Sequence, residues 1–202
     1  MDEVNGLEIN YKNNHAYKEF TKALLRLLEH NSYADIKIQD ILRESEYSKA
    51  SFYSYFKNKD ECMKSIIDDE VMRYLEGFIQ MFSHQEKLDE NKTKEREVLN
   101  HKKYFLHVYR YRAIYKSIFK DESLGEFYLY FIHKIRQGSI TKFATKESNL
   151  EELFVYRRVH LMIGTLEYWC QNDFKMSAEE LAEKCVQLSN ISGKDIVIKN
   201  GT

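Results

Sequence analysis

Apolar residues recur along most of this chain at the spacing of amphipathic helices. Between residues 14 and 30 they follow the i, i+3, i+7 spacing of one buried stripe, at Tyr17, Phe20, Leu24, Leu27 and Leu28. A longer stripe runs from Met63 to Phe82, about six helical turns without an internal breaker. The 202 residues include no proline and only seven glycines, so little interrupts these patterns and little supplies the turns of an all-β chain. The sequence therefore predicts an all-α fold.

Between the two stripes, residues 36–60 divide into two short amphipathic helices joined by a polar turn at 43–46. Their apolar positions are Ile38, Ile41 and Leu42, then Tyr47, Phe52 and Phe56. Ser48 can cap the second helix, and Asn58 with Glu61 can form a variant capping box that opens the following long helix. This is a helix-turn-helix pattern, and its short second helix suits the major groove of DNA. The polar residues expected on its outer surface are Ser48, Lys49, Ser51, Ser54 and Tyr55.

The segment 47–60, with the sequence YSKASFYSYFKNKD, resembles the signature of the TetR family of transcription regulators. In that signature an aromatic pair and a lysine close the DNA-binding head, and the resemblance covers residues 15–66. We accordingly expect a three-helix helix-turn-helix head over residues 1–60 and a helical effector-binding and dimerisation domain over residues 61–202. The family usually has glycine where this chain has Glu46 and a small residue where it has Leu42. The turn at Glu46 is therefore either modestly strained or differently built.

The resemblance also implies a role for each residue of the DNA-contacting surface. The implied phosphate contacts are Lys37, Tyr55 and Lys59. The implied base-facing residues are Gln39, Lys49 and Ser51, with Tyr53 bordering both groups and Ser48 on the same surface. These roles suit the side chains, because lysine and tyrosine donate to phosphate oxygens, lysine donates to guanine, glutamine pairs with adenine, and Ala50 can touch a thymine methyl. The alternative is that the lysines form an ordinary solvated surface over an aromatic core.

The remainder of the chain carries two further groups of candidate residues. An aromatic block is either a core of large side chains or a cavity for a small apolar or aromatic effector. Its candidate lining residues are Tyr104, Phe105, Tyr109, Tyr115, Phe127 and Phe131. Two final helices, expected at 150–171 and 178–191, carry stripes that predict a dimer surface, unless one subunit buries them. The dimer candidates are Phe154, Arg157, Leu161, Gly164, Thr165, Tyr168, Leu181, Cys185 and Leu188.

Charge and composition narrow the class of protein further. The net charge of −1 provides no overall attraction for DNA, so binding would depend on local lysines. The sequence shows no Gly-rich phosphate loop, nucleophile elbow or metal-spaced His/Cys pair, so we expect neither an enzyme nor a metal or other cofactor. Cys62, Cys170 and Cys185 are odd in number and lie in apolar helical patterns, as reduced thiols of a cytosolic protein do.

The first dozen residues are unlike a signal peptide, and no apolar run approaches the roughly 18 residues of a membrane span. We expect a cytoplasmic protein with no membrane contact. The charged segment 84–97 is expected to be a loop or a solvated helical end, and 121–123 a turn. Together these features predict a homodimeric repressor that binds double-stranded DNA at a palindromic operator under effector control. The alternative is an interaction protein of the same fold that responds to a protein partner.

Overall fold

The computed structural model describes residues 14–82, 90–120, 124–142 and 151–189, and within these ranges it contains helices and no strands. The helices are α2 (His15–Leu28), α3 (Ile38–Ser45), α4 (Lys49–Tyr53), α5 (Lys59–Phe82), α6 (Glu90–Arg110), α7 (Arg112–Lys120), α8 (Gly125–Lys142), α9 (Glu151–Gln171) and α10 (Ala178–Leu188). The predicted all-α class is confirmed. The predicted turn at 121–123 lies outside the described residues, as does 84–89. Residues 90–97 form the start of α6, and residues 91–97 are exposed or partly exposed, in keeping with the predicted solvated helical end.

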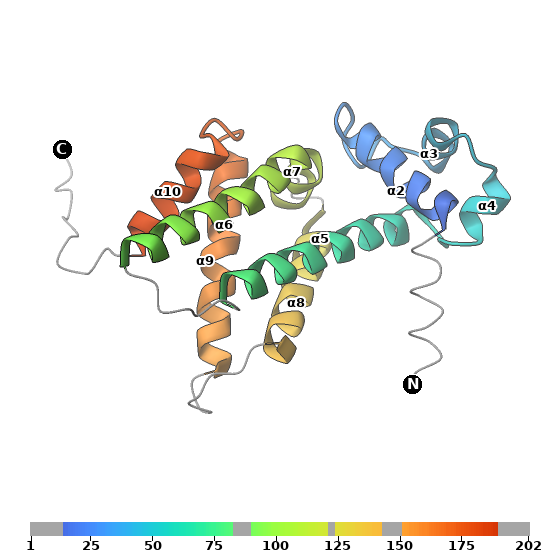
Figure 1. Cartoon of the computed structure of the whole chain (residues 1–202). Coiled ribbons are helices and arrows are strands. Elements are labelled where there is room, and N and C mark those ends of the chain that lie inside the picture. The colour runs from blue at the N-terminus through green and yellow to red at the C-terminus, as the bar shows by residue number, and fades with distance from the viewer. Residues whose placement is uncertain (1–13, 83–89, 121–123, 143–150, 190–202) are drawn as a thin grey trace, which may run out of the picture.

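Helices α2, α3 and α4 form a head at one end of the long α5, as Figure 1 shows. The predicted apolar stripe of α2 faces inward, and Phe20 is completely buried. Its ring centroid lies 5.2 Å from that of Phe52 on α4 and 5.5 Å from that of Tyr47. Phe56, which precedes α5, lies 5.4 Å from Phe52 and is 3% exposed. The helix-turn-helix therefore rests on a continuous aromatic core.

Both helix caps expected in the head are present. The Ser48 hydroxyl accepts a hydrogen bond from the Ser51 backbone N–H at 3.1 Å. Asn58 Oδ1 accepts from the Glu61 backbone N–H at 2.9 Å, and the Glu61 carboxylate accepts from the Lys57 backbone N–H at 2.8 Å. The capping box thus closes one residue earlier than its usual form. A cap of this kind stabilises a helix by about 1 kcal/mol, so these local bonds set where α4 and α5 begin.

The turn at Glu46 has the left-handed geometry that glycine favours. Glu46 follows the end of α3 with φ 61° and ψ 23°. A side chain in this region costs roughly 1–2 kcal/mol in steric repulsion. Of the two possibilities that the sequence left open, the strained turn is therefore the one adopted.

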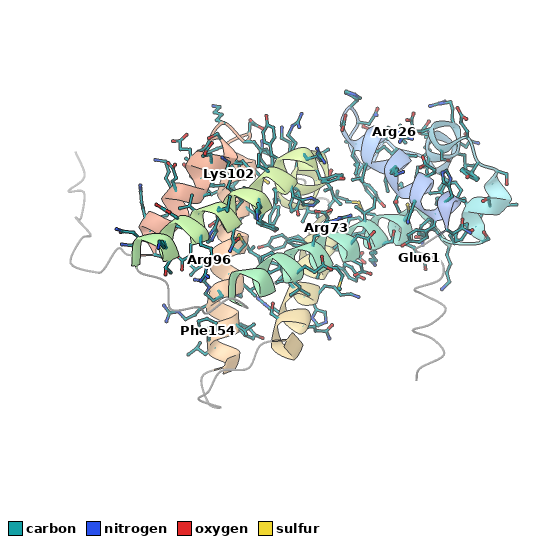
Figure 2. The ribbon with its side chains drawn as sticks, in the orientation of Figure 1. Arg26, Glu61, Arg73, Arg96, Lys102 and Phe154 are labelled. Carbon is teal, nitrogen blue, oxygen red and sulfur yellow. The ribbon has the colours of Figure 1, made fainter. Side chains whose placement is uncertain are left out.

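The remaining helices form the body, defined here as α5 to α10. Helix α6 packs along α10, and α8 packs against α5 and α9. Figure 2 shows Lys102 on α6, whose ammonium pairs with Glu179 of α10. Gly138 on α8 allows a close approach to α5, because a Cβ there would lie 2.3 Å from Leu75 Cδ1. Phe105, Phe131 and Trp169 are completely buried, so the aromatic block provides the centre of this body.

Tyr33, in the loop between α2 and α3, joins the head to the body. Its hydroxyl donates to Asp60 Oδ1 at 2.5 Å, next to the start of α5. Its ring meets that of Phe127 on α8 edge to face, with centroids 5.2 Å apart. Helix α2 also contacts both α5 and α7. The head is therefore held on the body through side chains as well as through the covalent continuation into α5.

Candidate nucleic-acid interface

Helix α4 and the start of α3 present the residues expected to contact DNA. Figure 1 shows α4 at the outer edge of the head, at the opposite end of the molecule from α10. The exposed members of the set are Lys37, Gln39, Ser48, Lys49, Ala50 and Tyr53. The partly buried members are Ser51, Tyr55 and Lys59. The helix-turn-helix therefore gathers these nine residues on the head and leaves most of them open to solvent.

The outer face of α4 combines a cation with an aromatic ring. Lys49 and Tyr53 are one helical turn apart, and the lysine Nζ lies 5.9 Å from the centroid of the tyrosine ring. Tyr53 is 47% exposed, and its ring packs perpendicular to the buried Phe52 with centroids 5.6 Å apart. Phe52 thus holds the helix from behind, while Lys49 and Tyr53 face outward. A side-chain pair of this kind can donate hydrogen bonds to base edges or phosphates.

At the start of α3, a second exposed lysine lies where the helix dipole is positive. The Lys37 backbone N–H donates to Asp40 Oδ2 at 2.9 Å, and Arg43 pairs with Asp40 Oδ1 at 2.8 Å. The Lys37 N–H bond, with a further contribution from Arg43, holds the pKa of the Asp40 carboxyl below its ordinary value. Lys37 and Gln39 remain exposed beside this capped turn. The combination of a helix N-terminus and a lysine favours a phosphate group nearby.

Lys59 has a structural role that the sequence did not reveal. Its Nζ donates to the backbone carbonyls of Tyr33 and Ile36, both at 2.6 Å, and lies 4.0 Å from the centroid of the Tyr33 ring. Burial lowers the pKa of this ammonium, against the opposing charge of Asp60. Two of its three donors therefore hold the loop between α2 and α3. Its contact with a DNA phosphate stays a prediction, and the third N–H is the donor that such a contact would use.

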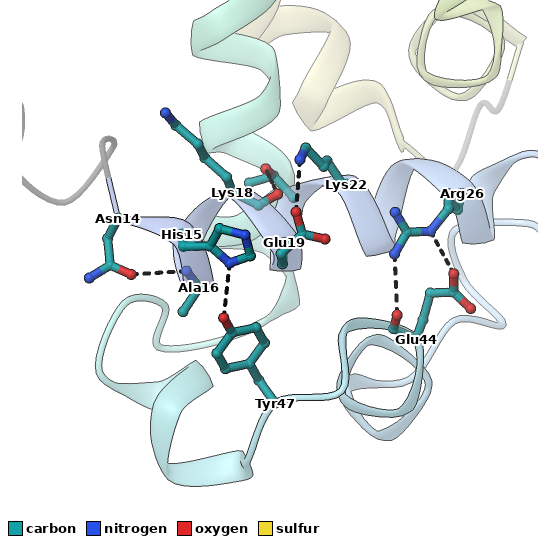
Figure 3. A network of polar contacts seen from close by, with 10 residues as sticks. Asn14, His15, Ala16, Lys18, Glu19, Lys22, Arg26, Glu44 and Tyr47 are labelled. Atoms are coloured by element: carbon teal, nitrogen blue, oxygen red, sulfur yellow. Dashed lines mark hydrogen bonds and ion pairs between the residues drawn. The ribbon is translucent and has the colours of Figure 1, made fainter.

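A polar network in the head fixes α2 against the helix-turn-helix from both ends. His15 Nδ1 lies 3.0 Å from the Tyr47 hydroxyl near the start of α2, and a dashed line marks this contact in Figure 3. Near its end, Arg26 donates to the Glu44 carboxylate at 2.6 Å and to the Glu44 carbonyl at 3.2 Å. Glu44 and Tyr47 flank the turn between α3 and α4. His15, Arg26 and Glu44 were missed at the sequence level because their partners lie 32 and 18 residues away.

Most of the residues predicted to line an effector cavity are packed inside the body. Phe105, Tyr115, Phe127 and Phe131 are buried, Tyr104 is partly buried, and Tyr109 is 44% exposed. The two grooves found along the described residues are lined by other side chains. The effector role of these six residues therefore stays a prediction.

The aromatic core of the body surrounds a buried carboxylate, Glu70 on α5. Glu70 is 5% exposed, and its Oε2 lies 2.7 Å from both the Tyr115 hydroxyl and His107 Nε2. Arg73 approaches the other oxygen at 3.6 Å. Burial raises the pKa of the Tyr115 phenol well above its ordinary value, so this hydroxyl stays protonated and donates to the carboxylate. Glu70, His107 and Tyr115 are called the polar centre below.

The residues predicted to form a dimer surface fall into two classes. Several apolar side chains of α9 and α10 are exposed, with fractions of 41% for Phe154, 64% for Leu161, 53% for Tyr168 and 62% for Leu188. Phe154 projects from α9 in Figure 2. Gly164 and Arg157 are exposed on the same face, and a Cβ at Gly164 would meet nothing within 4 Å.

The second class turns toward its own protomer. Leu181 is 4% exposed and packs within the body, as the alternative for these stripes predicted. Thr165 and Cys185 are partly buried. The exposed residues Phe154, Leu161, Tyr168 and Leu188 are called the α9–α10 surface below.

No helix among the described ranges is long and apolar enough to cross a membrane.

Comparison with known proteins places the whole arrangement in one family. Residues 20–66 match the family model described as "Bacterial regulatory proteins, tetR family", and residues 100–191 match the model described as "Transcriptional regulator C-terminal region". No curated protein matches this sequence.

Two solved structures are similar over nearly their full length. One is a protein of Syntrophomonas wolfei, described as a TetR-family transcriptional regulator, with a TM-score of 0.65 and 15% identity over 87% of this chain and 93% of that one. The other is a TetR transcriptional regulator from Streptococcus agalactiae, with a TM-score of 0.51 and 17% identity over 92% of this chain and 98% of that one. At these identities the two structures support the fold. The family-model matches to the head and the body show that this chain is a DNA-binding transcription regulator of the TetR family.

Proposed function

We propose that this regulator is a homodimeric repressor that reads a palindromic operator with α4 of each subunit, under the control of an effector that acts on the body. The observation that carries the proposal is the outer face of α4, where Lys49 and Tyr53 are exposed over the buried ring of Phe52. A short helix supported from behind and open in front is the form that a recognition helix takes in the major groove.

The proposal of a dimer rests on the small number of bases that one α4 can contact. The helix has only five residues, so a single head contacts few bases, and two heads related by a two-fold axis would double the contact. The α9–α10 surface supplies exposed apolar residues for such an association, and the open space at Gly164 permits helices to approach closely. Sedimentation of Gly164→Arg should show monomers where the natural protein forms dimers. An unchanged dimer would place the interface elsewhere.

Effector control is supported by the polar centre and by the joint at Tyr33. The polar centre links α5, which carries the head, to α6 and α7, so a molecule that rearranges these helices would also move the start of α5. Tyr115 belongs to the polar centre, and Phe131 packs against its ring with centroids 6.3 Å apart. The six aromatic residues named from the sequence remain our candidates for the effector site. The other candidate controller is a protein partner, which would act on the body surface and leave this core closed.

The test of DNA reading is selection from a library of random duplexes by the full chain at about 0.15 M salt, because affinities depend steeply on ionic strength. The proposal expects enrichment of an inverted repeat. Enrichment of a single half-site would retain DNA reading and remove the dimer. Failure to enrich any sequence would contradict the proposed operator binding.

A further inference from the structure

A groove separates the head from the body at the end of α2 that points away from α4. It has a volume of about 620 Å³ and lies between the end of α2 with its following loop and the end of α6 with α7. Figure 1 shows α7 approaching α2 at this place. The cations that line it are Arg110, Arg112, Lys116 and Lys120, against one carboxylate, Glu29. The groove is therefore strongly positive in a chain whose net charge is only −1.

The four cationic side chains differ in how many contacts they already make with other residues of the protein. Lys116 and Lys120 both reach Asp173 Oδ1, at 3.3 Å and 2.7 Å, so one carboxylate already offsets part of their charge. Arg112 donates to the Tyr109 carbonyl at 3.3 Å and lies 5.0 Å from the centroid of the Tyr109 ring. The Arg110 side chain has no hydrogen-bond or ion-pair partner among the residues that the structure describes.

Arg110 and Arg112 thus retain most of their donors at the mouth of the groove. A guanidinium carries five N–H donors in a planar fork that fits the oxygens of a carboxylate or phosphate. Both side chains are exposed, and they come from the end of α6 and the start of α7. Apart from the contact of Arg112 with Tyr109, the guanidinium donors are available to an anion in the groove.

The opposite wall of the groove has the reverse character. It contains Glu29 and the C-terminal end of α2, where the helix dipole is negative. Its polar side chains are committed locally, with Asn31 donating to the Leu27 carbonyl at 2.8 Å and Ser32 donating to Asp35 at 2.6 Å. Carbonyls and carboxylates on this wall accept hydrogen bonds, so they repel an anionic group and favour a donor such as a hydroxyl.

We propose that this groove binds a small hydroxylated anion, whose phosphate or carboxylate lies on Arg110 and Arg112 and whose hydroxyls face the end of α2. Its volume is within the range of about 300–1,000 Å³ that small-molecule sites occupy. The site is separate from the aromatic core that the effector proposal uses, and from the DNA-contacting face of α4. It is a second place where the body can respond to a metabolite.

The groove also borders the joint between head and body. Tyr33 lines the groove. Its carbonyl accepts a hydrogen bond from Lys59 Nζ, and its ring packs against that of Phe127. An anion that bridges α7 and the end of α2 would hold the arrangement of head and body described here. Given the proposed operator binding, on which this step rests, the anion would change operator affinity, by about 5- to 150-fold in the usual range of such coupling.

The test is calorimetric titration of the full chain with glucose 6-phosphate and with citrate, up to about 10 mM at fixed ionic strength. Glucose serves as the neutral control. We expect one site for at least one of the two anions and none for glucose. The groove variant is Arg110→Gln with Arg112→Gln, and the matched control is Lys103→Gln with Lys175→Gln, which removes the same charge from exposed positions outside the groove. The groove variant should bind at least ~10-fold more weakly, and the control should bind as the natural protein does.

Two outcomes count against the site. No binding of either anion, or equal losses in the groove and control variants, would overturn it, since equal losses indicate diffuse attraction. If glucose 6-phosphate binds more tightly than citrate, the ligand of the groove belongs to the phosphate esters. If citrate binds more tightly, the ligand belongs to the hydroxy acids. Because calorimetry uses no DNA, failure of the operator proposal leaves this result standing, and failure of the groove leaves the operator proposal intact.

Discussion

In the head, the rings of Phe20, Phe52 and Phe56 pack directly on one another, whereas in the body the aromatic core surrounds the charged side chain of Glu70. In the head, the bond between His15 and Tyr47 lies at the exposed edge, and that of Lys59 with the Tyr33 carbonyl is only partly buried. Those of the polar centre lie inside, where Tyr115 is 1% exposed. The two regions therefore differ in how deeply their polar bonds are buried.

We therefore expect the head to be rigid and the body to be sensitive to the loss of single hydrogen bonds. An apolar core is non-directional and keeps one shape over a wide range of conditions. A buried carboxylate is tolerated only while its partners stay in place, because a lost partner leaves it unsatisfied in a region of low dielectric constant. Loss of a hydrogen-bond partner of Glu70 should therefore destabilise the body more than loss of an exposed polar bond destabilises the head.

The largest effect is expected from opening the aromatic core of the head. Phe52→Ala removes a completely buried ring and should lower the free energy of unfolding by about 3–5 kcal/mol, with loss of DNA binding. Leu129→Ala is the control, because Leu129 is 66% exposed and should change stability by less than about 0.5 kcal/mol. Urea unfolding of both variants measures this. Equal losses would mean that Phe52 does not anchor α4.

Next in size is the loss of the Lys59 clamp. Lys59→Ala leaves the Tyr33 and Ile36 carbonyls without their charged donor and should lower the free energy of unfolding by about 1–3 kcal/mol in the absence of DNA. The exposed Lys57 is the control, with an expected change below about 0.5 kcal/mol for Lys57→Ala. The contrary result has two parts: Lys59→Ala leaves the free energy of unfolding unchanged without DNA, and it lowers the slope of DNA affinity against salt concentration by about one unit. Lys59 would then serve only as a contact to a DNA phosphate.

Removal of one hydroxyl oxygen from the polar centre should lower the free energy of unfolding by a similar amount. Tyr115→Phe deletes the donor to Glu70 while keeping the ring, and should destabilise the body by about 1–3 kcal/mol. Tyr109→Phe, at a position 44% exposed, should change stability by less than about 0.5 kcal/mol. Thermal unfolding compares the two. A neutral Tyr115→Phe would remove the contrast between head and body drawn above.

The smallest expected effect is a gain at the turn of the head. Glu46→Gly relieves the left-handed backbone and should raise the free energy of unfolding by up to about 1 kcal/mol. Glu46→Ala removes the same carboxylate and retains Cβ, so it should give no such gain. If alanine stabilises the head as much as glycine does, the carboxylate and not the backbone conformation is the source of the strain.

Local features of the head could be predicted because their partners are near in sequence. The caps at Ser48 and Asn58 join groups three residues apart, and periodicity alone identified the buried face of α2. The resemblance to the family then supplied the roles of Lys37, Gln39 and Lys49, all of which the structure leaves exposed.

Contacts between distant segments could not be predicted from periodicity. Lys59 and Tyr33 are 26 residues apart, and the donors of Lys59 were assigned to DNA because no local pattern shows that two carbonyls accept them. Leu161 and Leu181 both lie on apolar helical stripes, yet only Leu181 faces a neighbouring helix of the protomer. Likewise, Glu70 follows Asp68 and Asp69 on an amphipathic helix, and the sequence gives no sign of which of the three carboxylates is buried.

Base reading by α4 through Lys49 is tested by measuring the preference for each base pair of the operator. Lys49→Ala should relax the preference at one base pair in each half-site, with a cost of about 1–3 kcal/mol at that pair. Lys57→Ala, on the exposed segment after α4, is the matched control and should keep the full profile. Selection of random duplexes by the three proteins at the same salt concentration gives the comparison. A Lys49→Ala profile identical to that of the natural protein would contradict the claim that α4 reads the operator through this residue.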